Sequence, residues 1–156
     1  MDDIIVALRR HDRWDREAFL SDFTRSECYW KPLKLEECAG DTFLESEFRL
    51  SKTGRLSCRL KNVNAHGLKV WRYHSYTSGL DYATKRATLL GTLKKVDRMA
   101  SDANERIPSA LDKCREFLSL GYPVGILRYM CGLLAAETGH KEWLRIKRML
   151  PEQRTT

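Results

Sequence analysis

The sequence predicts an α+β fold, in which a partial sheet precedes a basic helical subdomain. Apolar and polar residues alternate in parts of the first 61 positions, which is typical of half-buried strands. From Tyr82 onward, apolar residues recur at helical spacing. Hydrophobic residues make up 42% of the 156 residues, which is enough to bury a core. The expected parts are a sheet region over 1–61, a connector over 62–81, a helical subdomain over 82–150 and a tail over 151–156.

The first part is expected to hold a strand, a helix and a second short strand. Two acids at the N-terminus precede an apolar, β-branched run, which predicts a turn and then a buried strand. A helical rhythm follows over 15–29, and Asp12 or Asp15 could cap its start. A brief alternation over 33–36 predicts the second strand.

A β-hairpin is expected next. Residues 42–50 and 55–61 both alternate between apolar and polar side chains. They flank Lys52-Thr53-Gly54, whose composition favours a turn. We therefore expect two paired strands joined at this glycine-bearing segment.

Four helices should follow the connector. The first carries an apolar stripe made of Leu89, Leu90, Leu93, Val96 and Met99. The second is expected to begin at Pro108, because proline suits the first helical position, and to stop at Gly121. The third begins at Pro123 and is broken by Gly139. The fourth is short and basic and spans 141–150.

The charge of the chain favours an anionic partner. The formal net charge is +7, and it is concentrated in the helical half. Residues 82–150 hold 13 basic and seven acidic side chains, whereas residues 1–81 are nearly neutral. Nucleic acid is the commonest partner for such a basic surface.

Cysteines and hydropathy predict a soluble intracellular protein, in the nucleus or the cytoplasm. The five cysteines are odd in number and none has Cys-x-x-Cys spacing, which argues against a disulfide framework or a zinc site. The N-terminus lacks the basic start of a signal peptide. No stretch approaches the roughly 20 apolar residues that span a bilayer, so we expect no membrane partner.

Asp2 and Asp3 are the candidate catalytic and metal-binding residues. Two carboxylates at the turn before a strand can ligate Mg²⁺ for two-metal phosphoryl transfer. By itself, an acidic pair is more often a solvated terminus. The order of the elements that follow shifts the balance toward the metal site.

In that order the chain resembles the second half of a reverse transcriptase of the eukaryotic retroelement type, Penelope-like elements included. Met1-Asp2-Asp3-Ile4-Ile5-Val6 is similar to the catalytic palm motif, although the aromatic residue that precedes the family's methionine is absent. Phe43-Leu44-Glu45-Ser46-Glu47-Phe48 resembles the start of the primer-grip hairpin. Tyr82-Ala-Thr-Lys-Arg-Ala-Thr and Phe117-Leu-Ser-Leu-Gly-Tyr-Pro123 resemble the thumb helices. The resemblance extends from Met1 to about Ala136.

This resemblance implies that residues 1–61 form a partial palm and residues 82–150 a thumb-like subdomain. It also implies an RNA or RNA/DNA duplex as ligand. A complete enzyme of this family has a third palm aspartate and fingers, which would have to come from a companion chain. Mg²⁺ is therefore expected only in an assembled site, with Asp2 and Asp3 as ligands. The chain could be a truncated gene copy, the second half of a split enzyme or an adopted fragment.

Eight basic side chains are the predicted contacts to nucleic acid. The hairpin contributes Arg55, Arg59 and Lys61, and the first basic helix contributes Lys85, Arg86, Lys94, Lys95 and Arg98. Such cations neutralise phosphates and release counterions without choosing a sequence. An ordinary hairpin and an ordinary solvated helix face fit the same patterns. A second basic patch lies at Lys141, Arg145, Lys147 and Arg148.

Three functions remain open from the sequence. The chain is part of an RNA-directed DNA polymerase, a non-catalytic binding module, or an adopted structural subunit of a ribonucleoprotein. The aromatic connector Trp71-Arg72-Tyr73 could stack bases. A packed loop is the favoured interpretation of that connector.

Overall fold

The computed structural model describes residues 45–64 and 72–151, the backbone of 42–43, and five residues nearer the N-terminus: Asp15, Glu17, Ala18, Ser21 and Asp22. The chain forms two compact units, Met1–Asp41 and Thr42–Thr156. The predictions for Asp2, Asp3 and the strand at 33–36 lie outside the described residues. The same holds for Trp71 and the middle of the connector.

Asp15 caps a helical segment in the first unit. Its carboxylate oxygen accepts hydrogen bonds from the backbone N–H groups of Glu17 at 2.9 Å and Ala18 at 3.3 Å. These bonds satisfy donors that a first helical turn leaves free. One of the two predicted caps is therefore confirmed.

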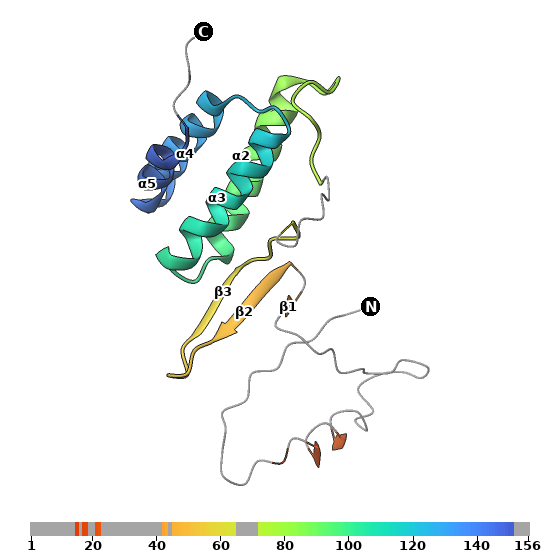
Figure 1. The fold of residues 1–156 in the computed structure, drawn as a ribbon, viewed down its shortest axis with the longest axis vertical. Helices are drawn as coiled ribbons and strands as arrows, with labels where there is room; N and C mark the ends of the chain where they lie inside the picture. The colour runs from red at the N-terminus through yellow and green to blue at the C-terminus, as the bar shows by residue number, and fades with distance from the viewer. Residues whose placement is uncertain are drawn as a thin grey trace. The chain divides into compact units, whose positions relative to one another are not determined.

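The second unit is α+β, as predicted, with a small antiparallel sheet and four helices (Figure 1). The sheet contains β1 (Thr42–Phe43), β2 (Ser46–Leu50) and β3 (Leu56–Leu60), in that order. The alternating run over 42–50 was expected to be one strand, but it is two. A tight turn follows Phe43, which pairs with Ser46 across it.

The hairpin between β2 and β3 confirms the predicted turn. Gly54 has a φ of 81°, a backbone conformation that strains residues carrying a Cβ atom. The loop is closed by the Ser51 N–H, which donates to the Arg55 carbonyl at 2.8 Å. Beyond the loop, β3 runs back to the helices, where Leu60 is buried in the core.

The outer edge of β3 is bonded to the loop between two helices. The Cys58 N–H donates to the Ser101 hydroxyl at 3.1 Å, and the Ser101 N–H donates to the Cys58 carbonyl at 2.9 Å. Leu60 and these two bonds fix the hairpin to the helices. The hairpin therefore belongs to the helical unit, although we had grouped it with the preceding segment.

The helices are α2 (Tyr82–Met99), α3 (Ala103–Ser119), α4 (Val124–Thr138) and α5 (Glu142–Met149). Leu89, Leu93 and Val96 of the predicted stripe on α2 are fully buried. Helices α2 and α3 run side by side, with α4 and α5 packed together beyond them (Figure 1). Gly139 has a φ of 73° and follows α4, which confirms the predicted break there.

The start predicted for the second helix was wrong. Helix α3 begins five residues before Pro108, because Asp102 is a better cap: its carboxylate accepts from the N–H groups of Asn104 and Glu105 at 2.8 and 3.2 Å. Pro108 therefore lies inside the helix, where its missing N–H leaves the Asn104 carbonyl without the usual helical bond.

The core of this unit lies where the four helices meet. Its largest fully buried side chains are Trp143, Phe117, Leu89, Leu93, Leu127, Met130, Leu134 and Ile146. The connector packs onto one end of it, since the Tyr73 ring stacks on Phe117 at 4.7 Å between ring centroids. The packed-loop interpretation of this part of the connector is therefore the correct one.

A buried polar cluster centred on Asp97 ties three helices together. One carboxylate oxygen of Asp97 accepts from Trp143 Nε1 at 2.8 Å and contacts His140 Nδ1 at 2.9 Å. The Arg106 guanidinium lies 2.9 Å from the same oxygen, and it also pairs with Glu142 at 3.1 Å. Asp97 thus joins α2 to α3 and α5.

Within the described part of the chain, no helix is both long and apolar enough to cross a membrane.

Candidate nucleic-acid interface

Four basic side chains converge on a hollow of about 520 Å³ between the hairpin, the connector and α2. They are Lys61 after β3, Arg72 and Lys95, with Lys113 reaching in from α3. Lys61 and Lys95 were predicted contacts, and Arg72 had been considered with the connector. Lys113 was missed, because nothing in its spacing distinguishes it from a solvated helical lysine.

The hollow exists because α2 presents small side chains to it. Ala87, Thr88, Gly91 and Thr92 line the helical wall. A Cβ atom built at Gly91 would meet no atom within 4 Å, so the space in front of this helix is open. A helix with large side chains at these positions would fill the hollow.

Glu45 lies at the hollow and neutralises two of its cations. Its two carboxylate oxygens pair with Arg72 at 3.2 Å and with Lys95. All three side chains are substantially exposed, at 39 to 48% of their surface. Water screens such pairs, so each contributes little to stability and can exchange for another anion.

The other two cations of the hollow differ in their burial. Lys113 is buried and donates to the Glu116 carboxylate at 2.7 Å, and its ammonium also lies over the Tyr73 ring. Lys61 is exposed, and it has no ion pair among the residues that the structure describes. Lys61 is therefore the cation most available to a phosphate.

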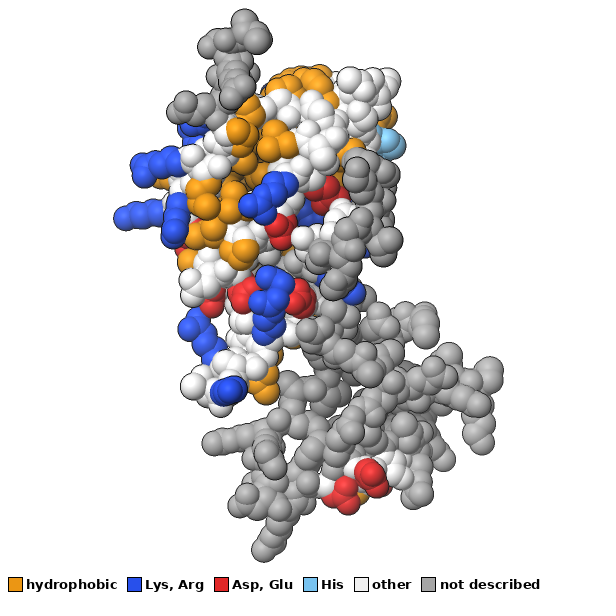
Figure 2. All heavy atoms as spheres, viewed as in Figure 1, with side chains coloured by type: hydrophobic (Ala, Val, Ile, Leu, Met, Phe, Trp, Pro, Cys, Tyr) orange, Lys and Arg blue, Asp and Glu red, His pale blue; other side chains and the backbone are white. Residues whose placement is uncertain are grey.

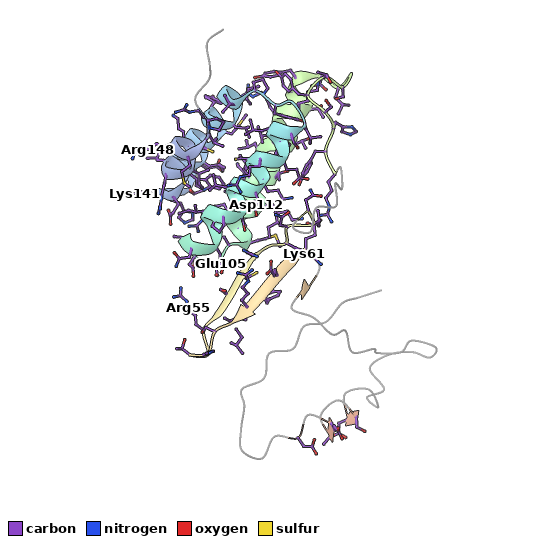
Figure 3. The ribbon with its side chains drawn as sticks, in the orientation of Figure 1. Arg55, Lys61, Glu105, Asp112, Lys141 and Arg148 are labelled. Carbon is purple, nitrogen blue, oxygen red and sulfur yellow. The ribbon has the colours of Figure 1, made fainter. Side chains whose placement is uncertain are left out.

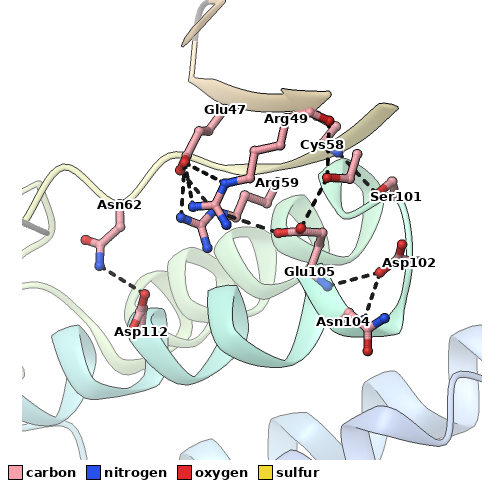
Figure 4. A network of polar contacts seen from close by, with 11 residues as sticks. Glu47, Arg49, Cys58, Arg59, Asn62, Ser101, Asp102, Asn104, Glu105 and Asp112 are labelled. Atoms are coloured by element: carbon pink, nitrogen blue, oxygen red, sulfur yellow. Dashed lines mark hydrogen bonds and ion pairs between the residues drawn. The ribbon is translucent and has the colours of Figure 1, made fainter. Parts of the chain in front are cut away.

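The two hairpin arginines that were predicted as contacts, Arg55 and Arg59, form ion pairs with acids of the helical part, and Figure 4 shows those of Arg59. Arg59 bonds the Glu47 carboxylate at 2.9 and 3.1 Å and approaches Glu105 of α3 at 3.9 Å. Arg55 pairs with Asp102, the cap of α3, at 2.8 Å. Arg59 is mostly buried, whereas Arg55 keeps 69% of its side chain exposed.

The hydrogen bond from Arg59 lowers the pKa of Glu47, with a smaller contribution from Arg49. The carboxylate is thus held in its charged form, and Arg59 is held to the sheet. Arg59 therefore acts mainly as a link between the hairpin and α3, whereas the Arg55 side chain is still accessible to solvent. Nearby, Asn62 donates to Asp112 at 3.0 Å and strengthens the same junction (Figure 4).

Two of the predicted nucleic-acid contacts on α2, Lys85 and Lys94, already interact with other groups of the protein. Lys85 is buried: its ammonium donates to the Ser78 carbonyl at 2.7 Å and lies over the Tyr76 ring. This lysine holds the connector against α2 and is not a surface cation. Lys94 pairs with Glu137 of α4 at 2.6 Å and keeps a third of its side chain exposed.

The remaining two predicted contacts have no ion pair among the described residues. Arg98 is exposed near the end of α2. Arg86 lies near two tyrosine rings at the other end of the helix, 5.5 Å from the centroid of Tyr82 and 5.6 Å from that of Tyr129.

A second basic surface lies on α5. Lys141, Arg145 and Arg148 are exposed on or beside this helix, while its Trp143 and Ile146 are buried. Figure 3 shows Lys141 and Arg148 far from Lys61, on the other side of the helices. Basic side chains project from that edge in Figure 2. None of these three cations lines the basic hollow.

Comparisons with protein-family models, curated proteins and solved structures found no match. In the described residues, no group of three or more His, Cys, Asp or Glu side chains is placed to hold a metal ion. The residues proposed to bind Mg²⁺, Asp2 and Asp3, lie outside those residues. The basic hollow is therefore the main candidate functional site among the described residues.

Proposed function

We propose that this chain is a nucleic-acid-binding fragment of an RNA-directed DNA polymerase of the reverse-transcriptase type. The observation that carries the binding proposal is the convergence of Lys61, Arg72, Lys95 and Lys113 on one hollow. The order of a hairpin followed by basic helices supports the polymerase part of the proposal. In that interpretation the hairpin corresponds to a primer grip and the helices to a thumb.

The hollow fits a phosphate of an RNA or RNA/DNA backbone. Its cations come from segments far apart in sequence, so they surround the space instead of forming one line. Glu45 already places a carboxylate between Arg72 and Lys95, which is the contact a phosphate oxygen would make. A bound phosphate would replace this exposed internal pair and release counterions.

The binding test is fluorescence anisotropy of a labelled RNA/DNA duplex with the full chain across a salt series. Lys61→Ala should weaken binding and reduce the slope of log K against log salt by about 1. Lys52→Ala is the matched control, because Lys52 is also an exposed lysine of the hairpin region and does not line the hollow. Equal losses in the two variants, or binding that ignores salt, would overturn the proposal.

Two further variants test the hollow itself. Gly91→Leu adds volume without changing charge, and its Cβ atom would meet no other atom within 4 Å. This variant should weaken binding while its circular dichroism is retained. Glu45→Gln should tighten binding several-fold, because it removes the anion that competes with phosphate for Arg72 and Lys95. Weaker binding by Glu45→Gln would show that these pairs only stabilise the fold.

The alternative is an adopted RNA-binding or structural subunit of a ribonucleoprotein that performs no catalysis. The same basic hollow supports it, since phosphate binding needs no reacting group. Replacing Asp2 and Asp3 with asparagine in cells that express the gene separates the two functions. Loss of RNA-directed DNA synthesis with unchanged RNA binding supports the polymerase, and an unchanged phenotype supports the subunit.

A further inference from the structure

A second hollow, of about 340 Å³, lies between the first turns of α2 and α4. Its lining consists of Tyr82, Arg86, Gly125, Ile126 and Tyr129. It shares no lining residue with the basic hollow. Two aromatic rings, one guanidinium and a glycine without a side chain therefore frame a shallow space at one end of the helical unit.

The two tyrosines of this hollow are unusually open to solvent. Tyr82 is 50% exposed and Tyr129 is 54% exposed. Their rings approach the guanidinium of Arg86 at nearly equal distances, 5.5 and 5.6 Å to the centroids. Aromatic rings and planar arginine guanidinium groups stack on nucleobases.

Arg86 differs from the arginines of this unit that form ion pairs. Arg55, Arg59 and Arg106 each pair with a carboxylate. Within the described ranges, Arg86 has contacts with rings but no ion pair with an acid. Its charge is therefore available to an incoming anion while the rings hold its orientation.

A purely structural role explains this arrangement less well. A packing contact between α2 and α4 would bury the tyrosines that make it, yet about half of the surface of each tyrosine is exposed. The two helices are already linked by the ion pair between Lys94 and Glu137. The hollow is thus an open aromatic and cationic surface.

We propose that this hollow binds an unpaired nucleobase of a single-stranded nucleic acid. The base stacks on Tyr129 or Tyr82, and Arg86 contacts the adjacent phosphate. No side chain of the hollow has a fixed donor and acceptor pair for a base edge, so binding there does not select a sequence. The inference rests on the proposed function for its class of ligand, but on different residues.

The test compares two labelled single strands of equal length, oligouridine and an abasic strand with the same phosphates. Tyr129→Ala should weaken oligouridine binding about tenfold and leave the abasic strand nearly unchanged. Tyr129→Phe keeps the ring and should bind both strands as the natural protein does. Because Tyr129 is exposed, both variants should keep the helical circular dichroism.

A crosslinking measurement locates the contact directly. Oligonucleotides containing 4-thiouridine, irradiated with the full chain, should label the tryptic peptides 73–85 and 129–141, which carry Tyr82 and Tyr129. Equal binding of oligouridine by the natural protein and Tyr129→Ala, with no label in these peptides, would overturn the inference.

The two proposals fail in different ways. If Lys61→Ala has no effect but the difference between oligouridine and the abasic strand persists, the basic hollow is refuted and the stacking site stands. If Lys61→Ala lowers affinity for both strands while Tyr129→Ala lowers neither, the stacking site is refuted. If the natural protein binds neither single strand and does not bind the duplex, both proposals are refuted.

Discussion

Replacing Asp97 with alanine should be among the most destabilising single changes in the helical unit. Asp97 is 10% exposed, and one of its oxygens meets Trp143, His140 and Arg106. Its removal leaves the indole N–H of Trp143 buried without an acceptor. It also removes one of the two carboxylates that pair with the buried Arg106.

The expected cost follows from these contacts. An unsatisfied buried donor costs about 1–3 kcal/mol. Removing one partner of a buried ion pair costs about 3–5 kcal/mol. Because Glu142 still pairs with Arg106, we expect the sum of the two costs to lie near the lower limit of its range. We expect Asp97→Ala to lower the free energy of unfolding by about 4 kcal/mol, out of about 5–15 for a domain.

Urea denaturation followed by circular dichroism at 222 nm measures this loss. Glu137→Ala is the control, because it breaks the exposed ion pair with Lys94 and should cost less than about 1 kcal/mol. Asp97→Asn keeps one oxygen for Trp143 and should recover part of the loss. A change below about 1 kcal/mol for Asp97→Ala, with an unchanged denaturant slope, would refute the role given to this cluster.

Three other changes have directions set by the structure. Gly91→Ala should raise the free energy of unfolding by about 0.5–1 kcal/mol, since the new methyl group meets nothing and alanine favours the helix; a lower urea midpoint would contradict this. The pKa of Glu47 is below its ordinary value of 4.5, so its stabilising effect is complete above that pH and is lost as the pH falls through the lowered value. The difference in urea midpoint between the natural protein and Glu47→Gln should therefore shrink on acidification, and a difference independent of pH would refute the link. The hydrogen bond to the Cys131 thiol and burial together raise the pKa of Cys114, and both thiols are fully buried. Both cysteines should therefore react with iodoacetamide only when the protein unfolds. Alkylation of the native chain, detected by mass spectrometry, would contradict this prediction.

Local patterns were sufficient to predict most of the elements in the helical unit. The stripe containing Leu89 and Leu93 predicted α2, and Gly54 predicted the hairpin turn. The start of α3 was misplaced because proline at the first helical position is only a preference. The carboxylate of Asp102, six residues earlier, can form cap hydrogen bonds, and these decided the boundary.

The state of each basic side chain was harder to predict. Lys85 and Lys94 look alike in the sequence, but one is buried against the connector and the other pairs with α4. Glu45 meets Lys95, which lies fifty positions further along the chain. Such pairs depend on tertiary packing. The sequence therefore predicted both Lys61 and Lys95 as nucleic-acid contacts, but it could not show that Lys95 forms an ion pair with Glu45.

The bonds between Cys58 and Ser101 also determine how the sheet can grow. They occupy the outward-facing backbone groups at the middle of β3, so a further strand cannot pair there without displacing the loop that joins α2 and α3. Among the described strands, β1 is the other edge of the sheet, and it is two residues long. A β-strand that extended this sheet would therefore have to align beside β1, where only two residues offer backbone groups for pairing.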